Sequence, residues 1–285
     1  TGVPGRILLA IWGRESSYGR AAIPHNVFEV LGTKGFASTR SAYFTDELIA
    51  ALQIAERGAS PPQLKSSWAG ALGQPQFMPS NYLRYARDGD GDGRADIWGS
   101  APDTLASIAT YLADKGWQSG RDWGFEVTLP ASVSCTLEGP DQGRRISDWA
   151  ALGVTRVSGR PFPDNELRGE GYLMLPAGRL GPAFIVTPNF YVLKEYNKSD
   201  LYALFVGHVG DRIQYGVGDF SGRWQRIDAM LRRDVVAMQV ALQGMGHDVG
   251  GADGLVGYKT RRSIGRWQEA TGQAATCFPK AGMLR

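Results

Sequence analysis

Residues 4–19 read PGRILLAIWGRESSYG, and this stretch decides how the chain begins to fold. Pro4 suits the first turn of a helix, where its missing N–H breaks no hydrogen bond. Apolar side chains then recur at helical spacing at Ile7, Leu8, Ile11 and Trp12. Gly19 is a suitable end for the helix. The pattern predicts an amphipathic helix with one apolar stripe.

Glu15 lies on this apolar stripe, because it follows Leu8 by seven residues and Trp12 by three. Burial of its carboxyl against Trp12 is expected to raise its pKa, which is what a general acid working near neutral pH requires. The alternative is structural: Glu15 forms a helix-end ion pair with Arg14 or Arg20.

The composition excludes several classes of protein. The chain has 285 residues, of which 43% are hydrophobic and 21% charged, as in an ordinary globular protein. A net charge of +3 is too small to indicate nucleic acid, and no apolar run is long enough to cross a membrane. Two cysteines and three scattered histidines give no zinc-ligand spacing. No G-x-S-x-G or phosphate-loop motif is present, and no organic cofactor is expected. Carboxylates, amides, tyrosines and eight tryptophans remain, which is typical of a carbohydrate enzyme.

The predicted organisation is a mainly α (α+β) chain. Residues up to about 120 have helical patterns, with Thr45 capping a helix through Ile54 and Ser100 starting another. Short apolar runs punctuated by Gly and Pro predict a small β-rich lobe at about 124–197. The predicted domains are 1–220, a linker at 221–226, and a helical module at 227–285.

The segment DGDGDGRAD, residues 88–96, reproduces the first half of an EF-hand calcium loop. Its alternation directs three carboxylates inward, its sixth residue is glycine, and the seventh supplies a carbonyl. Gly99 stands where a bidentate Glu is usual, and Asp103 is the expected substitute. The predicted ligands of a structural Ca²⁺ are therefore Asp88, Asp90, Asp92, Arg94 and Asp103. The alternative is an acidic turn without metal.

Residues 66–80, SSWAGALGQPQFMPS, combine small residues, two glutamines and aromatic side chains. Neutral amides beside flat apolar surface are suited to holding uncharged sugar rings. A tight helix-packing loop explains the same residues equally well.

Four motifs in order resemble the MltB-type lytic murein transglycosylases: residues 13–19, 66–86 (SSWAGALGQPQFMPSNYLRYA), 88–98 (DGDGDGRADIW) and 187–197 (TPNFYVLKEYN). Together they span most of residues 4 to about 215. The tail, with Asp253-Gly254, Thr260-Arg261 and Trp267-Gln268, is similar to the three-helix peptidoglycan-binding domain of murein enzymes.

The resemblance implies a lysozyme-like helical catalytic domain with Glu15 as the single catalytic residue. It implies substrate contacts at Ser67, Gln76, Phe77, Met78, Asn189, Tyr191 and Tyr196, and a calcium site in the Asp88 loop. Residues 19–44 follow the family loosely, so contacts there do not transfer.

A lone acid suffices if the sugar supplies its own nucleophile, so the implied reaction cleaves the bond between N-acetylmuramic acid and N-acetylglucosamine with formation of a 1,6-anhydro ring. A hydrolytic muramidase, with Asp46 or Glu47 as second carboxylate, and a non-catalytic calcium-dependent murein-binding protein are the alternatives.

The substrate implies a periplasmic enzyme of murein turnover, either soluble or lipid-anchored through an N-terminus outside this sequence. The expected partners are peptidoglycan glycan strands, with other murein enzymes as further candidates. Cys135 and Cys277 lie in different predicted domains, and either a disulfide or two buried thiols fits them.

Overall fold

The computed structural model describes residues 1–227 and 230–284, and the chain divides into two compact units. Unit 1 comprises Thr1–Ser119 and Leu204–Val217, and unit 2 comprises Gly120–Ala203 and Gly218–Arg285. The boundary falls inside helix α9 (Asp200–Tyr215), whose first turn belongs to unit 2 and whose remainder belongs to unit 1.

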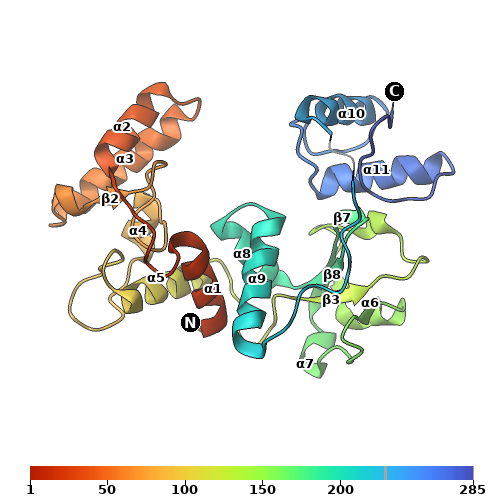
Figure 1. The fold of residues 1–285 in the computed structure, drawn as a ribbon, viewed down its shortest axis with the longest axis horizontal. Coiled ribbons are helices and arrows are strands. Elements are labelled where there is room, and N and C mark those ends of the chain that lie inside the picture. The colour runs from red at the N-terminus through yellow and green to blue at the C-terminus, as the bar shows by residue number, and fades with distance from the viewer. Residues whose placement is uncertain (228–229, 285) are drawn as a thin grey trace. The chain divides into compact units, whose positions relative to one another are not determined.

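Unit 1 is mainly helical, as predicted (Figure 1). Its short strands pair antiparallel, with His25 opposite Ser66. Helices α2 and α3 form a hairpin around a core that includes Leu31, Phe44 and Ile54. The elements of this unit before α9 are α1 (Gly5–Ser16), β1 (His25–Asn26), α2 (Val27–Ala37), α3 (Ser41–Glu56), η1 (Pro61–Gln63), β2 (Lys65–Ser66), α4 (Pro79–Tyr85) and α5 (Ala101–Asp114).

Two predicted helix ends in unit 1 are wrong by several residues. Helix α1 ends at Ser16, because Ser17 takes a left-handed conformation and its N–H closes on the Gly13 carbonyl. Helix α3 begins at Ser41, and the hydroxyl of Thr45 donates back to the Ser41 carbonyl from inside the helix. The predicted cap at Ser100 is confirmed, since its hydroxyl accepts the N–H of Asp103.

Unit 2 contains the predicted strand lobe, a five-stranded antiparallel sheet in the order β4-β6-β8-β3-β5. Ile185 on the central strand pairs with Phe125 on one side and Leu173 on the other. Trp149 is fully buried below the sheet and donates its indole N–H to the Gly171 carbonyl. The elements are β3 (Gly124–Thr128), η2 (Cys135–Leu137), β4 (Arg144–Arg145), α6 (Ile146–Ala151), β5 (Thr155–Arg156), α7 (Asp164–Leu167), β6 (Glu170–Met174), β7 (Pro176–Arg179), β8 (Ala183–Val186) and α8 (Pro188–Tyr196).

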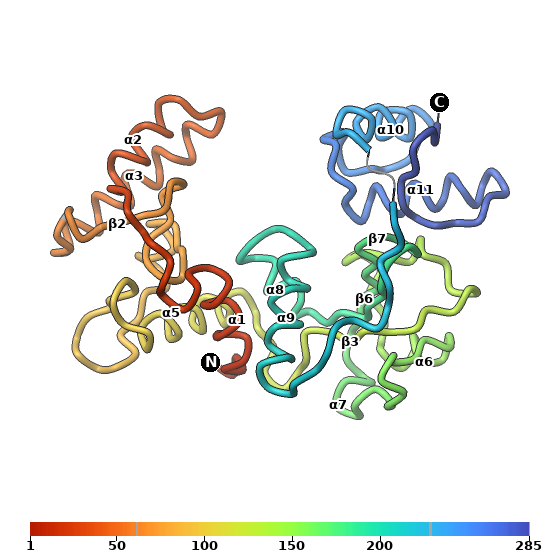
Figure 2. Tube along the Cα trace, in the orientation of Figure 1, coloured from red at the N-terminus to blue at the C-terminus, as the bar shows by residue number. Residues whose placement is uncertain are grey.

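The tail is part of unit 2 and contributes α10 (Arg232–Gly244) and α11 (Tyr258–Ala270). Both helices are drawn in blue in Figure 2. These are the two helices among the described residues after 226, where three were expected. The segment after α11 is irregular instead, and the Gln268 side chain holds it by accepting the N–H groups of Thr276 and Cys277.

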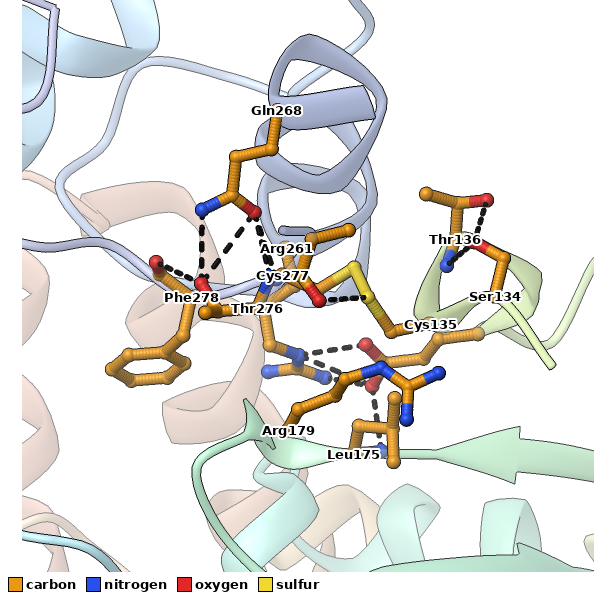
Figure 3. Close-up of a disulfide and its surroundings, with 12 residues drawn as sticks. Ser134, Cys135, Thr136, Leu175, Arg179, Arg261, Gln268, Thr276, Cys277 and Phe278 are labelled. Carbon is orange, nitrogen blue, oxygen red and sulfur yellow. Dashed lines mark hydrogen bonds and ion pairs between the residues drawn. A yellow bond between two sulfur atoms is a disulfide. The ribbon is translucent and has the colours of Figure 1, made fainter. Parts of the chain in front are cut away.

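Covalent and ionic links join the tail to the strand lobe (Figure 3). Cys135 and Cys277 form a disulfide, which settles the alternative that the sequence left open. Beside it, the Arg261 guanidinium donates to both oxygens of Glu138 at 2.5–3.1 Å. The exposed fractions of these two side chains are 4% and 1%, so the ion pair is buried. Arg261 also reaches Asp200 at the start of α9, at 3.2 Å.

The segment predicted as a linker lies along the strand lobe. The N–H groups of Ser221 and Gly222 donate to the Glu126 carboxylate at 3.0 and 2.6 Å, and the N–H of Gln225 donates to the Leu180 carbonyl. Within the described part of the chain, no helix has both the length and the apolar character that crossing a membrane requires.

Candidate active site

Glu15 occupies the last turn of α1 and is half-buried. The chain reverses immediately after it, with positive φ angles at Ser17 (52°) and Tyr18 (60°). The Tyr18 ring thereby folds back edge-on to Trp12, with centroids 5.4 Å apart. A Cβ at Gly13 would lie 2.7 Å from this ring, so a larger residue there would displace the ring from its present position. Such left-handed backbone at non-glycine residues costs free energy and is concentrated at functional sites.

A glutamine connects the end of α1 to the loop of residues 66–79. The indole N–H of Trp12 donates to Gln74 Oε1 at 2.7 Å, and Gln74 Nε2 donates to the Trp98 carbonyl, also at 2.7 Å. Gly19 allows the close approach, because a Cβ there would lie 2.6 Å from Gln74 Oε1. Gln74 was not among the predicted site residues, since nothing in its local sequence distinguishes it from Gln76.

The predicted residues of the loop differ in burial: Ser67 and Gln76 are half-buried, whereas Phe77 lies in the core. Ser67 is half-buried and its hydroxyl accepts the N–H of Ala71 at 3.2 Å. Gln76 has a left-handed backbone, with φ of 54°, and its side-chain amide donates to the Gly73 carbonyl. Phe77 is only 2% exposed, so its ring supports the loop from the core.

Met78 and Trp68 complete the loop. Met78 is half-buried against the unit 1 core, and it is the residue that precedes α4. The Trp68 indole is 73% exposed and carries the Lys34 ammonium 4.7 Å above its ring centroid. The loop and Lys34 of α2 therefore present an aromatic surface, a cation and neutral amide and hydroxyl groups, which suits a polar sugar chain.

The carboxylates proposed for the hydrolytic alternative have other roles or positions. Glu47 is 5% exposed, and its two oxygens accept the N–H and the hydroxyl of Ser80 at 2.9 and 2.7 Å. Glu47 thus holds the first turn of α4. Asp46 is exposed on the neighbouring face of α3. Glu15 is the acid that the end of α1 presents beside Trp12.

The acidic loop brings three of its predicted ligands together. One carboxylate oxygen from each of Asp88, Asp90 and Asp92 lies within 4.8 Å of the others. Ca²⁺–oxygen distances of about 2.3–2.6 Å require this spacing, so the residues fit the ion. The pKa of Asp88 is lowered, chiefly because the N–H groups of Gly93 and Gly91 donate to its carboxylate.

The two other predicted ligands, Asp103 and Arg94, are not part of this oxygen cluster but form hydrogen bonds with residues of the loop. Asp103 is buried, and its two oxygens accept the N–H groups of Gly89 and Asp96 at 2.8 and 2.7 Å. It therefore ties both ends of the loop to the start of α5. The backbone N–H of Arg94 donates to Asp92 at 2.8 Å, which orients that carboxylate within the loop.

Helix α8 of unit 2 carries the remaining predicted residues. Asn189 is fully buried, and its side-chain amide donates to the Arg121 carbonyl at 3.0 Å, so it anchors the helix. Tyr191 contacts Tyr172 edge-on at 5.1 Å, and burial raises the pKa of its phenol. Tyr196, the last residue of α8, stacks on Tyr202 with ring planes 9° apart.

A helical unit with one glutamate at the end of its first helix, an amide-rich loop beside it and a separate strand lobe define the lysozyme-like fold class. The chain belongs to the family of the transglycosylase SLT domain, which it matches over residues 1–211. The family resemblance predicted from the motifs is thereby confirmed.

Relatives of this family were found among curated proteins and solved structures. Membrane-bound lytic murein transglycosylase B of Escherichia coli (strain K12) is 33% identical over 214 residues, which make up 74% of this chain. The chain spans only 57% of the length of that curated relative.

Two solved structures are also similar. SltB3 from Pseudomonas aeruginosa, in complex with NAG-anhNAM-pentapeptide, is 40% identical with a TM-score of 0.90, covering 98% of this chain and 75% of its own. Lytic transglycosylase Slt35 of Escherichia coli, in complex with calcium, is 30% identical with a TM-score of 0.63, covering 75% and 67%. These likenesses confirm the predicted fold class.

Proposed function

We propose that the chain is a lytic transglycosylase of peptidoglycan, which cleaves the β-1,4 bond between N-acetylmuramic acid and N-acetylglucosamine. The observation that carries the proposal is the position of Glu15. It is half-buried at the end of α1 beside Trp12, while Glu47 is engaged by Ser80. The family and the relatives' printed names support the same reaction class.

The proposed mechanism uses Glu15 twice. Its carboxyl first gives a proton to the glycosidic oxygen, which leaves on N-acetylglucosamine as the muramyl C1–oxygen bond breaks. The muramyl 6-hydroxyl oxygen then bonds to C1, and its proton returns to the Glu15 carboxylate. The ring closes in place of attack by water because this hydroxyl is held at high effective concentration. No water is consumed, and the product ends in 1,6-anhydromuramic acid.

The loop residues hold the sugars in this proposal. Ser67, Gln76 and Met78 contact the substrate from unit 1, with Phe77 supporting them from the core. Tyr191 and Tyr196 are proposed as substrate contacts on α8, which Asn189 anchors. Half-buried positions at Ser67, Gln76 and Met78 support this division of roles.

We further propose that Asp88, Asp90 and Asp92, with the Arg94 carbonyl, hold a structural Ca²⁺, and that Asp103 closes the loop around it. The compact oxygen cluster supports this assignment. The ion would neutralise the three carboxylates and fix the connection between α4 and α5. The chemical step depends only on Glu15.

The proposed role of the tail and the proposed cellular location both depend on peptidoglycan being the substrate. Residues 227–285 are proposed to bind peptidoglycan, while residues 1–220 carry the reaction. Murein lies outside the cytoplasmic membrane, so we place the protein in the periplasm, either soluble or lipid-anchored.

Glu15→Gln tests the catalytic assignment, because the amide can neither donate the first proton nor accept the second. Turnover of purified murein should fall by orders of magnitude while binding to sacculi is retained. Glu56→Gln, which alters an exposed glutamate at the end of α3, is the matched control and should leave turnover unchanged. Full turnover by Glu15→Gln would instead favour a different acid, and absence of turnover in the native chain would favour the binding-protein alternative.

A further inference from the structure

A groove on unit 1 is lined by residues other than Glu15, Trp12 and the loop of residues 66–79. Its volume is about 1070 Å³, which is large enough for several sugar rings or a sugar with an attached peptide. Its walls are the end of α3 with the following residues 57–65, one side of α4, and the segment 94–99 that follows the acidic cluster. None of its lining residues is a proposed substrate contact, and Arg94 is the one lining residue that is also a proposed calcium ligand, through its carbonyl.

Two aromatic side chains form one wall of this groove. The rings of Tyr82 and Trp98 lie 5.5 Å apart at 48°, and both are half-buried. Their polar atoms are bonded within the protein: the Tyr82 hydroxyl donates to the Ala95 carbonyl and the Trp98 indole N–H to the Lys65 carbonyl. The rings are therefore held in fixed positions. Rigid aromatic surface of this kind packs well against the C–H face of a sugar.

Three cations accompany the aromatic wall. Arg57, Lys65 and Arg94 are all exposed lining residues. Among the described residues, none of these three side chains has a hydrogen-bond or ion-pair partner. Asp96 is the one carboxylate in the lining, and its Oδ1 already accepts the N–H groups of Trp98 and Gly99. The groove therefore offers three unpaired positive charges beside an aromatic surface.

We propose that this groove is an additional peptidoglycan-binding site, besides the site around Glu15 and the tail, in which Tyr82 and Trp98 receive a sugar and the three cations bind carboxylates of the peptide stems. The inference rests on the proposed function, because it assigns the groove to the same polymer. A second contact with that polymer keeps the enzyme on its substrate between cleavage events, since rebinding becomes intramolecular. Attraction by the exposed cations is screened by salt, so retention through the groove weakens as ionic strength rises.

The test reverses two of the three charges, Arg57→Glu and Lys65→Glu, in the full chain carrying Glu15→Gln, and leaves Arg94 unchanged because its carbonyl is a proposed calcium ligand. Binding to purified, protein-free sacculi is measured by co-sedimentation over a range of salt concentrations in calcium-containing buffer. The matched control makes the same charge change on the strand lobe, with Arg145→Glu and Arg160→Glu. These two arginines are also exposed.

The groove variant should bind sacculi about fivefold more weakly than the control, the size expected for two exposed charge contacts. Its binding should also depend less on salt than that of the control. With Glu15 restored, it should cleave short soluble glycan fragments at the native rate. That arm separates failure of the inference from failure of the proposed function, which would appear as no cleavage by the native chain.

Equal binding by the groove and control variants would overturn the proposal and leave an acidic protein partner as the better occupant. Loss of cleavage of short fragments by the groove variant would also overturn it, because the groove would then belong to the active site. Circular dichroism and melting of both variants establish that each is folded.

Discussion

Removing the disulfide between Cys135 and Cys277 should strongly destabilise unit 2. The double variant Cys135→Ser, Cys277→Ser removes the bond and keeps the chain length. Both cysteines are fully buried, and Cys277 belongs to the same core as Trp149 and Ile185. The bond links the tail to the strand lobe directly beside the buried Arg261.

The magnitude follows from the length of the loop that the bond closes. The cysteines are 142 residues apart, and the chain-entropy estimate for such a loop is about 17 cal/mol/K, or about 5 kcal/mol at room temperature. For a unit of about 150 residues, this corresponds to a lowering of Tm by roughly 10–20 °C.

Scanning calorimetry of the native chain, the double variant and the native chain under reductant provides the assay. Both cysteines of the sequence lie in unit 2, so the transition of unit 1 serves as an internal control. A change below about 1 kcal/mol would refute the reasoning, since the remaining contacts of the tail would then fix it without the bond.

Three further outcomes are expected. The pKa of Asp200 is lowered: burial opposes this, but the charges of Lys194 and Arg261 outweigh it. Asp200 therefore stabilises unit 2 at pH values above its unfolded pKa of about 3.9, and this contribution is lost as the pH falls through its lower folded pKa. Asp200→Asn should therefore flatten the acid limb of a curve of unfolding free energy against pH. Calcium added to chelated protein should raise Tm, because a ligand at a hundred times its Kd adds about 2.7 kcal/mol to the free energy of unfolding. Asp88→Asn should abolish this rise. An unchanged Tm in the native chain would exclude the site. Glu47→Gln should lower stability by about 1–3 kcal/mol in urea unfolding while the rate of the chemical step at saturating substrate stays native, whereas a large fall in that rate would revive the hydrolytic alternative.

Local signals were sufficient for several elements. Ser100 followed by Pro102 marks the start of α5, and the apolar runs of β6 and β8 read as strands because they are short and bounded by Gly and Pro. Such features depend on neighbours in the sequence. They were predictable for that reason.

Helix α8 was hidden inside the segment predicted as β-rich. The signal was present, since Thr187 caps the helix and Pro188 occupies its first position. The strand-like runs before it led to a β prediction for the whole segment, because a helix of nine residues shows little helical periodicity. Its start could have been found from the Thr-Pro pair alone.

Long-range pairings could not be predicted from the sequence. Glu138 and Arg261 are 123 residues apart, and each resembles an ordinary surface charge in its local context. Gln74 likewise gains its role from Trp12, 62 residues away. Such contacts depend on how the elements pack, which a single sequence does not specify.

Mass analysis of the products from native murein tests the central proposal most directly. Ring closure assisted by Glu15 alone predicts muropeptides that end in 1,6-anhydromuramic acid, lack a reducing end and are lighter by one water than hydrolysis products. Products with reducing ends, which borohydride converts to muramitol, would contradict the transglycosylase mechanism and establish hydrolysis in its place.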